Sequence, residues 1–418
     1  MRPPVTPEAV EQAVRRLEPV VVRTPLQPNE RLSASVGASV WLKREDLQRV
    51  RSYKIRGAYN LIVQLADRSA GVVCASAGNH AQGVALACQE LEVHGRIYLP
   101  RTTPRQKRER IAALGGDCVE IIVTGDTYDE AAAAAATDAA RSGATLVPAF
   151  DDPRTVAGQG TVAIEVVEQL GFAPDVLVVP VGGGGLLAGI ATWMGARHPG
   201  TRVVGVEPAG AAAMVAALLA GEPVGLEGLD PFVDGAAVRR AGEVTYPIVR
   251  DAGVEVRTVE EGRVCTEMLE MYQSDGIIAE PAGALAPAAL ADGLLDDLGV
   301  EPGATVVAVL SGGNNDVSRY GEVLERSLVH RGLKHYFLVS FPQEPGALRR
   351  FLDEVLGPDD DITLFDYVKR NNRETGPALI AIETARPGDL AALRERLEAS
   401  PVAFEQIEPG SPMFQYLM

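Results

Sequence analysis

The sequence predicts an α/β protein built in two parts, and three observations lead to this prediction. Over residues 1–332, short apolar runs alternate with longer stretches of helical character, which is typical of a mostly parallel sheet flanked by helices. Near residue 333 the order of the expected elements changes to β-α-β-β-α-β. The chain of 418 residues is also longer than one hydrophobic core supports, about 250–300 residues. We therefore expect a first domain over 1–332 and a second over 333–418.

The first domain should begin with a helix, because Thr6 and Pro7 suit the N-cap and first position of a helix. Apolar runs rich in β-branched residues then predict strands at 38–43, 71–76, 95–100, 118–123, 175–181, 202–207 and 305–310. Between them, helices are expected at 109–116, 131–143 and 186–197. The second of these contains a run of alanine, the residue with the strongest helix propensity.

The second domain should be a ferredoxin-like unit. Strands are expected at 335–341, 361–368, 378–384 and 402–407, and helices at 347–356 and 389–399. Apolar residues recur at helical spacing in both helices: Leu348, Phe351, Leu352 and Val355 in one, and Leu390, Leu393 and Leu397 in the other.

The composition excludes several classes of partner. Lys and Arg total 39 against 56 Asp and Glu, and the net charge of -17 repels nucleic acid and anionic lipid surfaces. The 4 cysteines lack CxxC spacing and suit free thiols of a reducing compartment, and the 5 histidines form no metal-ligand pattern. With no apolar h-region near the amino terminus and no apolar run of about 18 residues, we expect a cytoplasmic protein without a membrane span.

Polar residues follow two expected strands at their carboxyl ends, where open α/β sheets bind ligands. In the turn "SAGNH", Ser76, Asn79 and the backbone N–H groups suit a carboxylate or a carbonyl-like oxygen, although a plain helix-capping turn explains the same residues. Ser311 ends another strand before two glycines, where it either faces a ligand or caps a turn.

A third strand end carries a run of glycines: Gly182, Gly183, Gly184 and Gly185. Such a run lets backbone N–H groups surround a phosphate at a helix N-terminus, and no Lys-[Ser/Thr] follows that would make it a Walker A loop. Gly183, Gly185 and Ala188 also fit the dinucleotide pattern G-x-G-x-x-A, with the acidic Glu207 about 20 positions on. A nicotinamide-dependent dehydrogenase is therefore an open alternative.

Together with "SYKIRGA" at 52–58, these loops resemble the fold type II pyridoxal-phosphate enzymes, the tryptophan synthase β family. The resemblance covers nearly all of 1–330 and rests on segments in a fixed order: "WLKREDLQ", "SYKIRGA", "SAGNHAQGVA", "AGQGT", "GGGGLLAG", "EPAGA" and "SGGNND". Within that family the sequence is most similar to the threonine ammonia-lyases (threonine dehydratases). Residues 338–356 resemble the start of the ACT-like regulatory domain of their biosynthetic members. The resemblance implies a catalytic region of two three-layer α/β/α subdomains, the smaller at roughly 52–155, and a single ACT-like domain.

The resemblance also implies a role for each site residue. Lys54 would form the Schiff base with pyridoxal 5'-phosphate, and the four glycines with the N–H of Leu186 would hold its phosphate. Asn79 would hydrogen-bond the ring hydroxyl, and Ser311 would face the pyridine nitrogen. The substrate carboxylate would lie against Ser76, Ala77, Gly78, Asn79 and His80. Tyr53 would pack near the cofactor. No metal site is expected, because Ala213 stands where the related serine racemases have an aspartate.

The expected reaction is β-elimination of L-threonine to 2-oxobutanoate and ammonia, the first step of isoleucine biosynthesis. The amine of Lys54, released when substrate takes its place, would remove the α-proton while the cofactor absorbs the electrons. A neutral Ser311 beside the pyridine nitrogen stabilises a carbanion less than a carboxylate would, which favours elimination over transamination. In the related serine racemases, a serine stands in the place of Ala77 and supplies a second acid on the opposite face of the substrate. Because Ala77 cannot do this, the resemblance disfavours racemisation. L-serine is an alternative substrate, and a non-enzymatic amino-acid sensor is an alternative function.

For the second domain, the resemblance implies isoleucine as an allosteric effector, with the loop 342–346 involved; a pure oligomerisation module is the alternative. It also implies a homo-oligomer, either a tetramer or a dimer.

Overall fold

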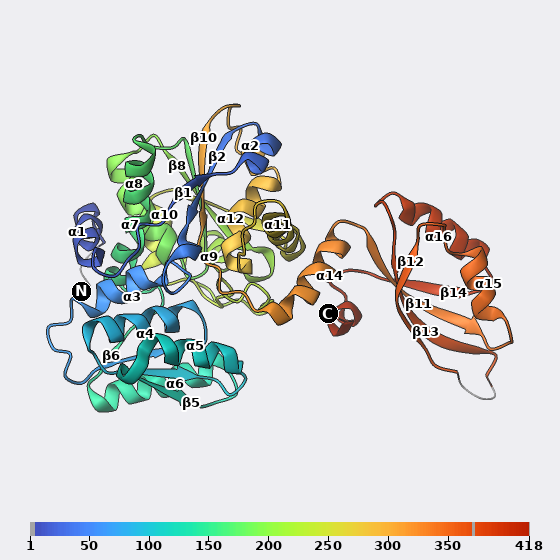
Figure 1. Ribbon diagram of the computed structural model, residues 1–418, viewed down its shortest axis with the longest axis horizontal. Coiled ribbons are helices and arrows are strands. Elements are labelled where there is room, and N and C mark those ends of the chain that lie inside the picture. Colours follow the sequence, from blue (N-terminus) through green and yellow to red (C-terminus); the bar gives the residue numbers. More distant parts are fainter. Residues whose placement is uncertain (1–4, 370–372, 418) are drawn as a thin grey trace. The chain divides into compact units, whose positions relative to one another are not determined.

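The computed structural model describes residues 5–369 and 373–417 (Figure 1). The chain divides into two compact units, Met1–Asp316 and Val317–Met418. Helix α14 (Tyr320–His330) belongs to the second unit. The expected division into a catalytic domain at 1–332 and a regulatory domain at 333–418 stays a prediction.

The first unit contains a six-stranded sheet in the order β1-β2-β10-β7-β8-β9. Its strands are β1 (Leu26–Pro28), β2 (Ser39–Arg44), β7 (Val176–Pro180), β8 (Arg202–Pro208), β9 (Glu255–Val259) and β10 (Thr305–Leu310). All pair in parallel except β1 with β2. Every residue of β7 is buried, which is why this strand reads as a continuous apolar run.

Helices cover both faces of this sheet. Figure 1 shows α7 (Pro153–Leu170), α8 (Gly185–Arg197) and α10 (Thr245–Asp251) on one side, and α11 (Glu261–Gln273) and α12 (Pro281–Ala291) on the other. The large sheet thus forms a three-layer α/β/α arrangement, as expected.

The smaller sheet of the first unit has the order β5-β4-β3-β6, and all its strands are parallel. They are β3 (Val72–Ala75), β4 (Gly95–Leu99), β5 (Val119–Val123) and β6 (Thr145–Leu146). Helices α4 (Asn79–Leu91), α5 (Arg105–Gly115) and α6 (Tyr128–Ser142) pack around it. Helix α3 (Lys54–Ile62) packs against both α4 and α7 and so joins the two sheets. The predicted α/β fold with two parallel sheets is confirmed, while the limits 52–155 stay a prediction.

The second unit has an antiparallel sheet in the order β12-β13-β11-β14 with two helices. The elements are β11 (Lys334–Pro342), α15 (Ala347–Glu354), β12 (Asp361–Tyr367), β13 (Thr375–Glu383), α16 (Asp389–Ala399) and β14 (Ala403–Ile407). This is the predicted β-α-β-β-α-β order. Phe351 and Val355 enter the core with Phe337, whereas Leu348 and Leu352 are each 42% exposed. Of the four residues predicted at helical spacing, two thus pack in the core and two are partly exposed.

The remaining elements are short or terminal. Helix α1 (Pro7–Leu17) begins as predicted, because Ala9 N–H donates to Thr6 Oγ1 over 3.2 Å. The others are α2 (Glu30–Val36), η1 (Glu45–Leu47), η2 (Gly116–Cys118), η3 (Ala209–Ala211), α9 (Ala213–Ala220), α13 (Leu294–Asp297), η4 (Val317–Arg319) and α17 (Pro412–Leu417). Within 5–369 and 373–417, none of the helices has the length and apolar character that crossing a bilayer requires.

Candidate active site

Two segments far apart in the chain meet at Lys54. Ser52 forms an antiparallel bridge with Gly312, directly after β10. Tyr53 N–H donates to the carbonyl oxygen of Ser311 over 3.1 Å. Lys54 begins helix α3 immediately after this pairing, so the backbone fixes the predicted lysine next to the predicted ring-facing serine.

The Lys54 amine lies in a partly buried, polar setting. Its Nζ donates to the carbonyl oxygen of Ala149 over 3.3 Å and lies 5.2 Å from the centroid of the Tyr53 ring. The Tyr53 ring thus lies beside the Lys54 amine, and the predicted packing of Tyr53 near a cofactor stays a prediction.

A buried ionic network lies beneath the first turn of α3. The guanidinium of Arg56 contacts Glu45 over 2.8 Å and Glu165 over 2.7 Å, and its side chain is 1% exposed. Lys43 Nζ reaches the second oxygen of Glu165 over 2.5 Å. Because these side chains come from β2, η1, α3 and α7, they tie the lysine-bearing helix to the large sheet.

The amide of Asn79 is held from both sides. Its Nδ2 donates to Glu280 Oε1 over 2.5 Å, and its Oδ1 accepts from Asn314 Nδ2 over 2.7 Å. Ser311 Oγ donates to the carbonyl oxygen of Ala282 over 3.2 Å. The two residues predicted to contact the cofactor ring are thus both anchored on the segment that opens α12.

The glycine run forms a cradle of backbone donors between β7 and α8. Within the described residues, the N–H groups of residues 182–186 find no acceptor, although all but Gly182 are buried. Buried N–H groups without a partner are rare in folded proteins, and at a helix N-terminus they suit an anion. The donors present therefore fit a phosphate group.

Side chains around the cradle explain why glycine is needed there. A Cβ added at Gly183 would lie 2.4 Å from the ring of Phe150, and Gly184 has φ +89. Thr245 Oγ1 donates to the carbonyl oxygen of Gly183 over 2.6 Å. The ring and the hydroxyl together fix the loop.

The "SAGNH" turn lies at the start of α4. Gly78 N–H donates to Ser76 Oγ over 3.2 Å, and residues 75–79 are partly exposed. His80, in contrast, is 4% exposed, and its Nε2 lies 2.8 Å from the carbonyl oxygen of Val147. Burial and the nearby Lys54 lower the pKa of His80 to about 4. The neutral ring of His80 therefore supports the turn, and only its backbone can face a ligand.

The carboxyl group of Glu280, which accepts from Asn79 of the "SAGNH" turn, is buried. Burial and the neighbouring Asp234 raise the pKa of Glu280 to about 7, against the opposing effects of Asn79, Lys107 and Lys54. Lys107 Nζ forms an ion pair with Asp234 over 2.9 Å. This carboxyl therefore gains or loses a proton near neutral pH.

The acidic residue of the dinucleotide pattern has another role. The carboxylate of Glu207 accepts from the backbone N–H of Met214 over 2.8 Å and of Val215 over 2.9 Å, at the start of α9. Glu207 is fully buried and its carboxylate caps α9, so this side chain is not placed to bind a ribose. Among the residues that the structure describes, no group of three or more His, Cys, Asp or Glu is placed to hold a metal ion.

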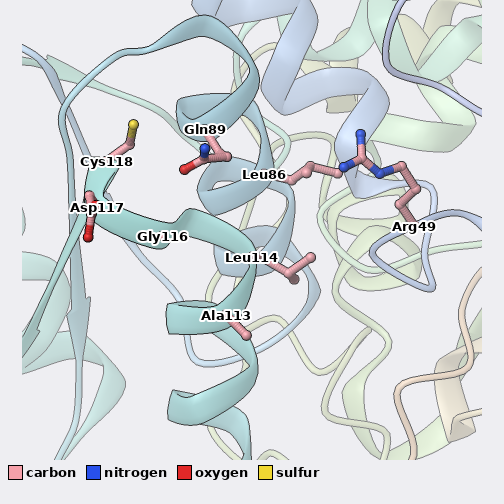
Figure 2. Close-up of a pocket in the computed structure, with 8 residues that line it drawn as sticks. All are labelled: Arg49, Leu86, Gln89, Ala113, Leu114, Gly116, Asp117 and Cys118. Carbon is pink, nitrogen blue, oxygen red and sulfur yellow. The ribbon is translucent and has the colours of Figure 1, made fainter.

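A pocket of about 430 Å³ lies elsewhere in the first unit (Figure 2). It is lined by Arg49, Leu86, Gln89, Ala113, Leu114, Gly116, Asp117 and Cys118. Figure 2 shows Leu86 and Gln89 on one helix and Ala113 and Leu114 on its neighbour. None of the predicted site residues lines this pocket, so it is not part of the candidate active site.

Sequence reasoning missed four residues that shape the site: Glu280, Asn314, Phe150 and Thr245. The first two lie in "EPAGA" at 280–284 and "SGGNND" at 311–316, segments that carried the resemblance, but neither residue was given a role. An acidic residue before a proline at the start of a helix was a usable signal for Glu280. Phe150 and Thr245 carry no local pattern, because they contact the glycine run only through the fold.

Comparisons with known proteins agree with this arrangement. Residues 17–312 match the family described as "Pyridoxal-phosphate dependent enzyme", and residues 325–417 match "C-terminal regulatory domain of Threonine dehydratase". "L-threonine dehydratase biosynthetic IlvA" of Mycobacterium tuberculosis (strain ATCC 25618 / H37Rv) is 64% identical over 413 residues, 98% of this chain and 95% of that protein.

Two solved structures are similar to most of this chain. The processed form of threonine deaminase isoform 2 from Solanum lycopersicum is 37% identical with a TM-score of 0.71, covering 78% of this chain and 96% of that one. Maize serine racemase is 31% identical with a TM-score of 0.70, covering 78% of this chain and 98% of that one.

Proposed function

Because the chain belongs to the pyridoxal-phosphate-dependent enzymes and ends in the regulatory domain of threonine dehydratases, we propose that it converts L-threonine into 2-oxobutanoate and ammonia. This reaction is the first step of isoleucine biosynthesis. The observation that carries the proposal is the similarity to a biosynthetic L-threonine dehydratase along nearly the whole chain, regulatory part included. The nicotinamide-dependent alternative is excluded by the family and by the helix-capping role of Glu207.

Pyridoxal phosphate, when bound, supplies the sink for the electron pair left at the substrate α-carbon. In our proposal Lys54 holds its carbonyl carbon, and the N–H groups of Gly182, Gly183, Gly184, Gly185 and Leu186 hold its phosphate. The orphaned donors of that run support this assignment. Asn79 binds the ring hydroxyl and Ser311 faces the ring nitrogen, since both side chains are anchored on the segment that opens α12.

Lys54 Nζ also removes the α-proton of the substrate in this proposal. The amine is oriented by the carbonyl oxygen of Ala149, and its helix is tied to the large sheet by Arg56. A base that is held in place reacts faster because less orientational freedom is lost in the transition state. Ala77 carries no acidic group for the opposite face, which supports elimination over racemisation.

The substrate carboxylate binds at the "SAGNH" turn in this proposal. Ser76 Oγ and the exposed N–H groups at the start of α4 are donors that suit a carboxylate. Ser76, Ala77, Gly78 and Asn79 contribute directly, whereas His80 contributes its backbone alone, because its ring is buried against Val147.

Several finer features belong to the same proposal. L-threonine is the substrate, with L-serine as the alternative that lacks the β-methyl group. Isoleucine is the effector of the regulatory domain, which the biosynthetic role of the relative supports. We also propose a cytoplasmic homo-oligomer, a tetramer or a dimer.

Ammonia release tests the proposal. Purified protein loaded with pyridoxal phosphate should release ammonia and 2-oxobutanoate from L-threonine, and isoleucine should slow the reaction. Lys54→Ala should lose at least about a thousandfold in kcat, because the base is removed. The matched variant Lys369→Ala should keep wild-type kcat, since that lysine is exposed and belongs to the second unit. Binding of L-threonine without release of ammonia would instead identify an amino-acid sensor.

A further inference from the structure

The segment that opens helix α12 contacts both residues proposed to face the cofactor ring. Glu280 is the N-cap residue of α12, and its Oε1 accepts from Asn79 Nδ2 over 2.5 Å. Two residues later, the carbonyl oxygen of Ala282 accepts from Ser311 Oγ. Glu280 itself is buried, with 4% of its surface exposed.

The close approach of Glu280 is built into the backbone around it. A Cβ at Gly312 would lie 2.0 Å from Glu280 Oε1 and 3.3 Å from Asn79 Nδ2. Glycine at this position therefore gives the carboxyl and amide groups the space in which they meet. A Cβ at Gly235 would come within 3.8 Å of the same carboxyl oxygen.

The contacts of Asn79 determine which way its amide points. Asn314 donates to Oδ1 and Glu280 accepts from Nδ2, so the amide nitrogen is on the Glu280 side. A primary amide nitrogen has two N–H groups, and Glu280 uses one of them. The second is available to a ligand, and its strength as a donor depends on the charge of the acceptor that holds the first.

The charged groups that face Glu280 come from three elements. Asp234 lies in the segment between α9 and α10, Lys107 on α5 and Lys54 on α3. The acidic neighbour favours the protonated carboxyl, and the two basic ones favour the ionised form. Together with burial, they place the proton exchange of Glu280 near neutral pH, with a pKa of about 7.

On the basis of the proposed function, we propose that Glu280 is a positioning residue that acts on the cofactor ring through Asn79. Its carboxyl group fixes the Asn79 amide with one N–H toward the ring hydroxyl. When Glu280 loses its proton, the hydrogen bond that Asn79 donates to it becomes stronger. The second N–H of Asn79, which faces the ring hydroxyl, then becomes a weaker donor. The protonation state of Glu280 thereby sets how strongly the ring oxygen is held.

The test uses the full-length holoenzyme and the absorbance of its bound pyridoxal phosphate from about pH 5 to about pH 9. Wild type should show a transition at or somewhat above pH 7, because the pKa of about 7 at Glu280 includes a lowering by the Lys54 cation, whose charge is lost when Lys54 holds the cofactor. Glu280→Gln should abolish this transition, because its neutral amide oxygen still accepts from Asn79 but the side chain has no proton to lose near neutral pH. The matched variant Glu301→Gln, at an exposed glutamate, should behave as wild type.

Two further variants test the charge dependence in opposite directions. Lys107→Met removes a cation that lowers the pKa of Glu280, so the midpoint should move to higher pH. Asp234→Asn removes an anion that raises it, so the midpoint should move to lower pH. A merely structural role for Glu280 predicts no such opposite shifts, and circular dichroism checks that each variant is folded.

The outcomes separate the two proposals. A wild-type transition that survives in Glu280→Gln, or shifts of the same sign in the Lys107 and Asp234 variants, would overturn the role of Glu280 and leave the proposed function intact. A wild-type protein that neither binds pyridoxal phosphate nor releases ammonia from L-threonine would overturn the proposed function and this inference with it.

Discussion

Replacing Arg56 by methionine should strongly destabilise the catalytic region. Arg56 donates two hydrogen bonds to Glu45 over 2.8 Å each, one to Glu165 over 2.7 Å and one to Thr161 over 3.1 Å. Without it, the fully buried Glu45 loses its main cation and two of its hydrogen bonds. Breaking a buried ion pair in this way lowers the free energy of unfolding by about 3–5 kcal/mol.

Urea unfolding, followed by circular dichroism, measures this difference. Arg105→Met is the matched control, because Arg105 pairs with Glu109 on the surface with its side chain 85% exposed. This control should change the free energy of unfolding by less than about 0.5 kcal/mol. Adding Glu45→Gln to Arg56→Met should recover part of the loss, because the uncompensated charge is then gone.

Two results would refute this reasoning. One is an Arg56→Met variant within about 1 kcal/mol of wild type, which would mean that water or Lys43 replaces the guanidinium. The other is a double variant no more stable than Arg56→Met, which would show that packing rather than charge determines the loss.

Two other predictions concern His80 and the glycine cradle. The pKa of His80 is lowered to about 4, so the unfolded chain binds its proton first on acidification, and stability should fall from about pH 6.5 to pH 4 by up to about 3 kcal/mol. His80→Gln, which keeps a donor for the carbonyl oxygen of Val147, should reduce that loss in urea midpoints measured across this range; an unchanged pH dependence would contradict the assignment. Gly183→Ala should weaken pyridoxal phosphate binding about a hundredfold in a spectroscopic titration, because the new methyl group would lie 2.4 Å from the ring of Phe150. Gly195→Ala, on the helix α8 that follows the cradle, meets nothing within 4 Å and should bind as wild type, so equal affinities in the two variants would contradict the cradle interpretation.

The sequence predicts the long elements of the fold well, because their patterns are local. The expected strand at 305–310 coincides with β10, and the β-α-β-β-α-β order of the second unit is confirmed. It misses β6, which has two residues, and β9, whose sequence "EVRTV" is partly charged. Both are held by pairing with a neighbouring strand, a property that no short window of sequence contains.

The residues of the candidate site also divide into those that a local pattern predicts and those that only the fold brings together. Asn79 and the glycine run are marked by local motifs, whereas Lys54 is marked only by the resemblance to a family. The contact between Asn79 and Glu280 joins residues about two hundred positions apart, and only the folded chain brings them together. Leu348 and Leu352 show the limit of a local pattern, because both are partly exposed. Helical spacing predicts a row of apolar residues, but it does not say which side of the helix the sheet covers.

The pairing of Ser52 and Tyr53 with the residues after β10 also has a consequence for synthesis on the ribosome. Strand β10 lies between β2 and β7 in the sheet, although it is the last strand of the first unit to be made. Until it emerges, β2 has no parallel neighbour and the lysine turn has no partner strand. A growing chain should therefore acquire the competence to bind its cofactor in a single late step, after almost the entire first unit has left the ribosome.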